Sequence, residues 1–93
     1  MSEPTITRIR ECVRSLNYVV SIHAAEELDD DNITILDLEN IILSGEIIER
    51  QRDTRTREVK CVVRGLTLDE RHAETVVKIG PTGKLFVITV YLA

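Results

Sequence analysis

The sequence predicts a single α+β domain, with N-terminal helices packed on one face of a four-stranded antiparallel sheet. In the first half of the chain, apolar residues recur every three or four positions, as on one side of a helix. After Glu46, apolar and polar residues alternate as they do in strands, and the short connections favour antiparallel neighbours. A chain of 93 residues has room for one hydrophobic core and no more. These three observations together favour one compact domain in which helices cover one side of a small sheet.

Two helices are predicted before residue 31. The first begins near Pro4, with Ser2 or Glu3 at its cap. Its apolar stripe consists of Ile6, Ile9, Val13 and Leu16. The segment 18–22 is rich in β-branched residues, and it is either a short strand or the approach to the next helix. That helix covers His23–Asp30 and is expected to end near Asp30, since carboxylates are unfavourable at a helix C-terminus.

The third predicted helix has clear start and stop signals. Thr34-Ile-Leu-Asp37 resembles a capping box, with Asp in the position that Glu usually takes. Gly45 is expected to end the helix as its C-terminal cap. Its buried stripe consists of Ile35, Leu38, Ile41 and Ile42. Asp37 and Glu39 are expected on the exposed side.

The predicted strands are Glu46–Arg52, Glu58–Leu66, His72–Ile79 and Lys84–Leu92. Because side chains alternate between the two faces of a strand, the pattern also assigns faces. The helices are expected to cover the face that carries Cys61, Val77 and Ile88. The other face is expected to carry Arg50, Lys60, Arg64, His72, Lys78, Thr89 and Tyr91.

Charge is distributed unevenly along the chain. Between Arg14 and Arg50 there is no lysine or arginine, while the same stretch holds nine acidic residues; the chain as a whole has twelve basic and sixteen acidic residues, a net charge of −4. The pattern predicts an acidic helical layer behind a basic sheet face. A sequence pI near 5.1 argues against strong RNA binding by the whole surface but allows a local basic groove. The arginine-rich segment 50–57 is the best candidate surface for an acidic or nucleic-acid partner.

Other features point to a cytoplasmic protein that needs no cofactor. Cys12 and Cys61 are too few for a disulfide framework and are expected to be reduced core thiols. No apolar run approaches the length of about 20 residues that a membrane helix needs, and the start lacks a secretory pattern, so no membrane partner is expected. His23, Glu26 and Glu27 share one side of a helix, but this is a weak metal signal, and a packed or capping histidine is the simpler interpretation.

A series of short motifs, in a fixed order, resembles a known bacterial family. The motifs are Ile22-His23-Ala24, Asn32-Ile33-Thr34, Asp37-Leu38-Glu39, Gly45-Glu46-Ile47-Ile48-Glu49, Val63-Arg64-Gly65 and Leu85-Phe86-Val87-Ile88-Thr89-Val90-Tyr91. Their order over about residues 18–92 resembles the family designated domain of unknown function 4258, which is grouped by fold with the RelE and BrnT toxins of toxin–antitoxin systems. The resemblance implies helices on one sheet face and, as in those toxins, a basic opposite face that cleaves messenger RNA.

The resemblance suggests a set of candidate catalytic residues, namely Lys60, Arg64, His72, Lys78 and Tyr91. Cleavage by 2′-hydroxyl attack needs a base for that hydroxyl, cations for the phosphorane and an acid for the leaving oxygen. His72 could act as base or acid, Tyr91 could orient or donate, and the cations could hold phosphate. The simpler interpretations are an exposed hairpin histidine and a tyrosine that packs on the sheet.

Two functions remain open at this point. Relatives often carry an arginine-rich helix after the His-Ala pair, where this chain has the acidic run Glu26–Asp31. This departure favours a partner-binding domain, non-catalytic or degenerate, whose protein partner would be antitoxin-like. The alternative is a toxin-type endoribonuclease that binds RNA through the basic face. If the last strand lies at the sheet edge, it could also pair with a second copy to form a homodimer.

Overall fold

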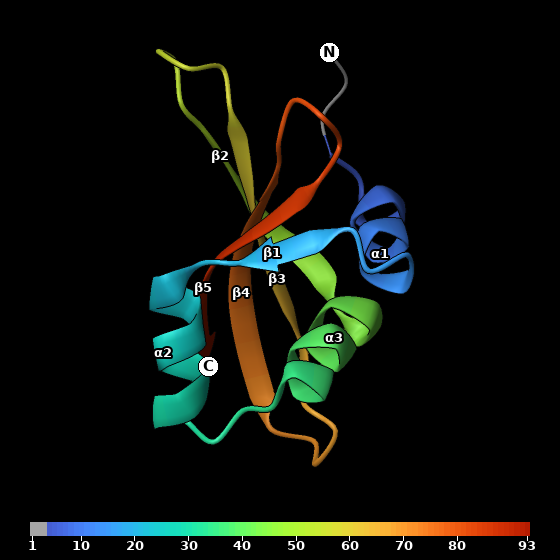
Figure 1. The fold of residues 1–93 in the computed structure, drawn as a ribbon, viewed down its shortest axis with the longest axis vertical. Helices are drawn as coiled ribbons and strands as arrows, with labels where there is room; N and C mark the ends of the chain where they lie inside the picture. The colour runs from blue at the N-terminus through green and yellow to red at the C-terminus, as the bar shows by residue number, and fades with distance from the viewer. Residues whose placement is uncertain (1–3) are drawn as a thin grey trace.

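The computed structural model describes residues 4–93 as three helices and a five-stranded mixed sheet (Figure 1). The helices are α1 (Ile6–Arg14), α2 (Ile22–Asp30) and α3 (Ile35–Ser44), and the strands are β1 (Tyr18–Val20), β2 (Glu46–Arg52), β3 (Val59–Leu66), β4 (His72–Ile79) and β5 (Leu85–Leu92). The strand order is β1-β5-β4-β3-β2. Within residues 4–93, no helix combines the length and apolar character needed to cross a membrane.

The prediction of a four-stranded antiparallel sheet is wrong in one respect. Strands β2 to β5 do form an antiparallel meander, but β1 adds a fifth, parallel strand beside β5. Only three residues form β1, too few to show an alternating pattern. A side-chain contact with α3 also fixes β1, since the Tyr18 hydroxyl donates a 2.5 Å hydrogen bond to Glu39.

Each helix begins at a side-chain cap. The α1 cap is Thr5, whose hydroxyl accepts a hydrogen bond from the Arg8 N–H, so the helix starts later than Pro4 suggested. Ser2 and Glu3, the predicted caps, lie outside the described residues. The predicted capping box of α3 is confirmed: Thr34 and Asp37 exchange hydrogen bonds of 2.9 and 3.0 Å.

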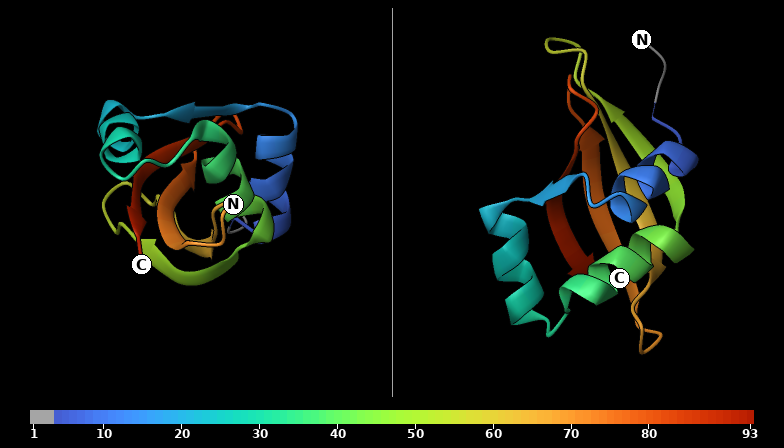
Figure 2. Two further views of the ribbon diagram at one scale, coloured as in Figure 1. Left: turned by 90° about the horizontal axis from the view of Figure 1, so that it is seen from below. Right: turned by 45° about the vertical axis from the view of Figure 1, so that its right-hand side comes forward.

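The end of α3 lies directly against β3 because two glycines allow the backbones to meet. Gly45 follows the helix as predicted, but its φ of −91° is ordinary, so it is not a left-handed cap. A Cβ at Gly45 would lie 2.4 Å from the Ile41 carbonyl oxygen, and one at Gly65 would lie 2.0 Å from the same atom. Both positions therefore depend on the absence of a side chain. Seen end-on, the twisted sheet curls around α3 (Figure 2).

The core lies between the helices and one face of the sheet. Its fully buried members include Ile9, Leu38, Ile41, Ile42, Cys61, Val63, Val77, Leu85, Val87 and Val90. Ile88 was expected to face the helices and is not among them. The register shifts between Val87 and Thr89, so Ile88 is a bulge residue. Before the bulge, the odd-numbered Leu85 and Val87 face the helices; after it, the even-numbered Val90 does.

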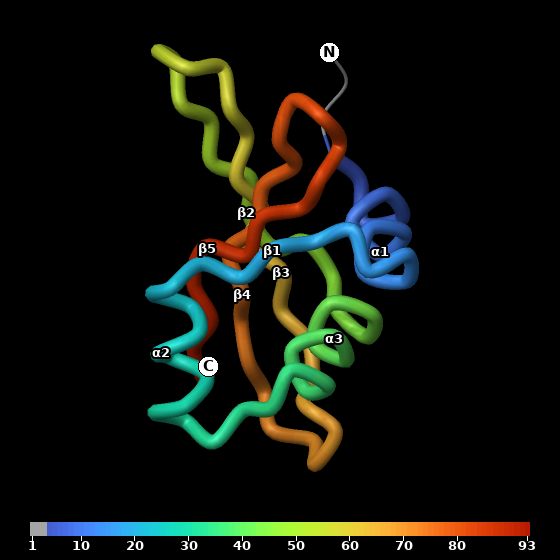
Figure 3. Tube along the Cα trace, viewed as in Figure 1, coloured from blue at the N-terminus to red at the C-terminus, as the bar shows by residue number. Residues whose placement is uncertain are grey.

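The α2 helix closes the outer edge of β5 where β1 ends (Figure 3). The Ser21 hydroxyl donates to the Ile88 carbonyl at 2.9 Å, and the Val90 N–H donates to Glu27 Oε1 at 2.9 Å. The Thr89 hydroxyl donates to the same carboxylate oxygen. The last strand is therefore an interior strand flanked by β1 and α2, and the edge position that self-pairing through β5 requires is not present.

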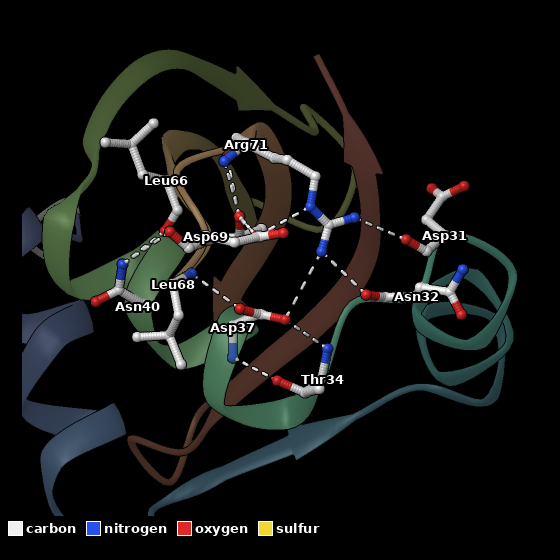
Figure 4. Close-up of polar contacts among 10 residues, drawn as sticks. Asp31, Asn32, Thr34, Asp37, Asn40, Leu66, Leu68, Asp69 and Arg71 are labelled. Atoms are coloured by element: carbon white, nitrogen blue, oxygen red, sulfur yellow. Dashed lines mark hydrogen bonds and ion pairs between the residues drawn. The ribbon is translucent and has the colours of Figure 1, made fainter.

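A polar cluster ties the start of α3 to the turn between β3 and β4 (Figure 4). Asp37 accepts the Leu68 N–H at 2.8 Å, while the Arg71 guanidinium donates to the carbonyls of Asp31 and Asn32, each at 3.0 Å. Asp37 was expected to be exposed, yet only 6% of its surface is accessible. Hydrogen bonds from the backbone N–H groups of Thr34 and Leu68 lower its pKa, so the buried carboxylate remains charged.

Candidate functional site

The sheet face opposite the core, called the open face below, carries its side chains in three rows across β2, β3, β4 and β5. Residues paired across neighbouring strands share a face, so the register defines each row. The rows are Glu46–Arg64–Glu74–Tyr91, Glu49–Val62–Val76–Thr89 and Gln51–Lys60–Lys78–Phe86, with His72 beside Leu66 at the end of β3. All five candidate catalytic residues therefore lie on the open face.

Arg50 was also expected there, and that prediction is wrong. The register of β2 shifts between Ile47 and Glu49, which leaves Arg50 opposite Cys61 on the helix-facing side. Its guanidinium approaches the Pro4 carbonyl oxygen at 3.4 Å. Phe86 alternates in step with Ile88 and would therefore share its expected helix-facing side, yet it lies on the open face opposite Lys78. Each change follows from a β-bulge. The extra residue puts the two parts of the strand out of step, so the alternation of side chains between the two faces reverses across it.

Glu74 is the centre of the first row. The Tyr91 hydroxyl donates a 2.7 Å hydrogen bond to Glu74 Oε1, and Arg64 Nε lies 4.0 Å from Glu74 Oε2. The glutamate side chain is only 17% exposed, compared with 50% for Arg64. One candidate group, Tyr91, is therefore hydrogen-bonded to this carboxylate, and a second, Arg64, lies at ion-pair distance from it. Glu74 alternates in step with His72 and Lys78, which were predicted on this face, but only the register shows that it lies between Arg64 and Tyr91.

The environment of Tyr91 keeps its hydroxyl protonated. The hydrogen bond to Glu74 raises the pKa of Tyr91, with further contributions from burial and from the nearby charges of Glu74, Glu49 and Glu27. A tyrosine with a raised pKa can donate a hydrogen bond but is a poor general base. The geometry therefore favours the donating role for Tyr91.

The third row holds the two lysines. Lys60 and Lys78 are directly paired, and Lys78 forms an ion pair with Glu58 at 3.2 Å. The Lys78 ammonium also lies 5.9 Å from the centre of the Phe86 ring, within the range of a cation–π contact. The charge of the Lys78 ammonium is thus balanced by Glu58 and further stabilised by the Phe86 ring. Lys60 lies near Asp53, whose pKa is lowered mainly by hydrogen bonds from the backbone of Arg55 and Thr56 and slightly by the lysine charge.

A shallow hollow of about 280 Å³ lies at one side of the open face. Its lining residues are Ser44, Glu46, Ile48, Arg64, Gly65, Leu66 and His72. His72 is exposed, and no hydrogen bond or ion pair is formed by its imidazole with any residue in the range 4–93. The structure therefore brings Arg64 and His72 to one hollow and places Lys60 and Lys78 outside it.

The open face is not basic, contrary to expectation. At its paired positions, the cations Lys60, Arg64 and Lys78 are matched by the carboxylates Glu46, Glu49 and Glu74. Positive charge is concentrated instead around the hairpin of β2 and β3, where the turn itself is neutral and the adjoining strand ends add Arg50, Arg52 and Lys60. Residues 50–60, called the basic hairpin below, contain Arg50, Arg52, Arg55, Arg57 and Lys60 against Asp53 and Glu58, a net charge of +3.

The basic hairpin and the acidic end of α2 lie at opposite ends of the long axis (Figure 1). The charge separation predicted between a helical layer and a sheet face is therefore a separation along the length of the molecule. Arg8, Arg10 and Arg14 of α1 add positive charge to the helical side, which further departs from an acidic helical layer.

The His23 and Glu27 pair on α2 takes part in packing that helix against β5. His23 Nε2 lies 3.4 Å from Glu27 Oε1, and this oxygen also accepts the hydrogen bonds from Thr89 and Val90. A carboxylate that already closes the β5 edge has little capacity left for a metal ion. Among residues 4–93, no group of three or more histidine, cysteine, aspartate or glutamate side chains is arranged to hold a metal.

The family was identified by comparison with known sequences. The family model described as domain of unknown function (DUF4258) matches residues 20–92. The chain belongs to the DUF4258 family. The matched DUF4258 segment starts in β1 and contains α2, α3 and the whole antiparallel meander, whereas α1 precedes it. Neither the curated proteins nor the solved structures yielded a match.

Proposed function

We propose that this DUF4258 domain acts by binding a protein partner with an acidic segment, and that it does so without catalysing a reaction. The observation that carries the proposal is the neutralised open face. Glu74 accepts a hydrogen bond from Tyr91 and lies at ion-pair distance from Arg64, and Glu58 forms an ion pair with Lys78. The exposed turn of the basic hairpin presents Arg55 and Arg57, whose charge would steer an acidic partner toward it by long-range attraction.

We also propose that the domain is related in fold to the RelE and BrnT toxins and that it acts in the cytoplasm. The order of helices and the antiparallel meander are consistent with the RelE and BrnT group, in which a small toxin is held by an antitoxin protein. We therefore place the partner in the antitoxin-like class. Two free, buried cysteines favour the reducing cytoplasm as the compartment.

Capture from an extract of the source cell tests the proposal. The wild-type chain and an Arg14→Glu control should both retain the same stoichiometric protein with an acidic segment. A variant with Arg55→Glu and Arg57→Glu should lose it, because both side chains lie in the exposed turn of the basic hairpin. Equal recovery by all three proteins would contradict the proposal.

The toxin-type endoribonuclease is a second candidate function, and one observation favours it. A carboxylate, an arginine and a tyrosine are adjacent in the first row, with His72 on the same face. Glu74 could accept the 2′-hydroxyl proton, Arg64 could neutralise the phosphorane, and His72 could protonate the leaving oxygen. Against it, Glu46 and Glu49 repel a polyanion from this face, and the Glu74 carboxylate is already bound to Tyr91.

A further inference from the structure

The outer edge of β5 is covered in two different ways along its length. Its first part, Leu85–Val87, pairs with the backbone of β1, whereas its second part lies alongside α2 (Figure 1). There the Ser21 hydroxyl donates to the Ile88 carbonyl at 2.9 Å. Glu27 Oε1 accepts the Val90 N–H, also at 2.9 Å. Side chains of α2 and its cap therefore take the place of a continued strand.

The α2 helix is attached to the sheet through little apolar surface. Of its nine residues, Ala24 and Leu28 are buried, whereas its first residue, Ile22, is 82% exposed. By comparison, α1 buries three of its nine residues and α3 buries four of its ten. Elements with few buried apolar contacts open at a lower free energy than the core does. Among the three helices, α2 is therefore the one that can leave the sheet most easily while the rest stays folded.

The sequence of α2 adds to this weak attachment. Asp29, Asp30 and the C-cap residue Asp31 crowd its C-terminal end, and the last turn contains no basic residue. Their charges oppose the negative end of the helix dipole. A helix of nine residues is also too short to be stable in water without tertiary contacts. The closed position of α2 therefore depends on its bonds to β5, among which those to Glu27 involve a charged group.

Both ends of α2 are fixed by other elements. Before the helix, the Ser21 N–H donates to the Val87 carbonyl at 3.0 Å. After it, the Arg71 guanidinium donates to the carbonyls of Asp31 and Asn32, each at 3.0 Å. Asn32 has a φ of 53°, in the left-handed region, where the chain turns toward α3. The helix can thus lift between two anchored points without loss of the connections on either side.

We propose that α2 is a cover that opens as a unit between Ser21 and Asn32, and that Glu27 is the latch that holds it closed. Opening exposes the outward backbone groups of β5 and releases the Thr89 hydroxyl, which donates to Glu27 in the closed form. Thr89 lies in the second row of the open face, so the position of α2 also affects that face. The cover belongs to the domain itself and does not depend on the proposed function.

Hydrogen exchange of the native 93-residue chain, followed for individual amides by NMR, tests this cover. The amides of Glu26–Asp30 and of Val90, called the cover amides below, should share one protection factor. It should lie at least about tenfold below that of Val63 and Thr75, which are paired at the centre of the sheet. The cover amides should also share one dependence on low concentrations of urea, as expected for residues that open together.

Glu27→Ala tests the latch. It should speed exchange of the cover amides by about tenfold or more, because it removes hydrogen bonds to a charged group. Glu26→Ala removes an exposed carboxylate from the same helix and is the matched control, which should change these rates by less than about threefold. If the alanine variant does not fold, Glu27→Gln replaces it. The glutamine keeps an acceptor oxygen but loses the charge, so it should speed the cover amides by about threefold or more.

Ile9→Val in α1 tests whether this opening is separate from global unfolding. Ile9 is fully buried, so the loss of one methylene group should speed exchange at Val63 and Thr75 by about fivefold. The cover amides should keep their wild-type rates, because α1 stays folded when α2 opens.

Three results would overturn the proposal. Acceleration of the cover amides by Ile9→Val, by the same factor as Val63 and Thr75, would show that α2 unfolds only with the whole domain. A Val90 amide as well protected as Val63 in the wild type would show that α2 does not expose β5. Cover amides that are unchanged by substitution of Glu27 would show that this carboxylate is not the latch.

Discussion

The Tyr91 hydroxyl donates a 2.7 Å hydrogen bond to Glu74, and the same carboxylate lies beside the Arg64 guanidinium. This relationship decides how the open face is interpreted. A tyrosine and an arginine on an exposed sheet face suggest an RNA site when they are considered alone. Bound to one largely buried glutamate, they form a neutral cross-strand cluster.

The first prediction concerns the titration of Tyr91. The carboxylate of Glu74 raises the pKa of Tyr91 above its ordinary value of 10.0, so Glu74→Gln should lower it toward that value. Spectrophotometric titration of the phenol measures the change. It should be performed in a Tyr18→Phe background, since the chain has only two tyrosines and the pKa of Tyr18 is raised to about 12. Glu46→Gln, in the same row, is the matched control and should leave the curve in place; an unchanged Glu74→Gln curve would show that Glu74 does not set the Tyr91 pKa.

The second prediction concerns acid stability. Asp37 has a pKa below its ordinary 3.8, so its contribution to folding is fully present above pH 3.8 and is lost as pH falls through the lower, folded-state value. Asp37→Asn should lower the free energy of unfolding at pH 7 by about 2 kcal/mol, because the amide cannot accept both backbone N–H groups as a charged carboxylate does. Urea unfolding between pH 2 and pH 7 (roughly the range over which carboxylates titrate) measures both effects.

The matched control for Asp37 is Asp30→Asn, which changes an exposed carboxylate near the end of α2. It should alter stability by less than about 0.5 kcal/mol, as is usual for surface substitutions. An Asp37→Asn protein that retains the full pH dependence of the wild type would contradict the role given to Asp37.

The third prediction concerns the contact between α3 and β3. Gly65→Ala should destabilise the fold by about 3 kcal/mol, because the added methyl would approach a backbone carbonyl oxygen that cannot move independently. Gly80→Ala should cost less than about 1 kcal/mol, since its methyl meets the Phe86 ring, which can rotate away. Thermal or urea unfolding compares the two variants, and equal losses would argue against a backbone contact at Gly65.

The fourth prediction concerns the two thiols. Cys12 and Cys61 are buried, and burial raises the pKa of each. Because the thiolate is the reactive form, the native protein should react with a disulfide reagent at pH 8 far more slowly than the urea-unfolded chain. Release of the coloured thiol reports both rates. A thiol that reacts at the same rate in the folded and unfolded protein would not be a core thiol.

Much of this fold could be predicted because local signals agree with the final structure. The capping box of α3, the end of α2 at Asp30 and the four meander strands are all found within about one residue of their predicted bounds. The match to the DUF4258 model over residues 20–92 agrees with the resemblance found in the motifs. These features depend on short-range chemistry and on the periodicity of apolar residues.

The features that could not be predicted depend on cross-strand register and tertiary contact. Bulges at Ile48 and Ile88 carry no sequence mark in this chain, yet they turn Arg50 away from the open face and bring Phe86 onto it. Asp37 resembled an exposed helix residue because its partners, Leu68 and Arg71, lie about thirty positions further on. Glu74 could be assigned a face, but its position between Arg64 and Tyr91 required the pairing of three strands.

The most direct test of the non-catalytic, partner-binding interpretation is the integrity of messenger RNA after induction of the protein in a bacterial host. The proposed function predicts normal growth and intact messenger RNA, and the purified protein should leave RNA uncleaved both with and without ribosomes. Growth arrest with cleavage that disappears in Arg64→Ala, Glu74→Gln or Tyr91→Phe variants that still fold would contradict it. That result would establish the first row of the open face as a ribonuclease site.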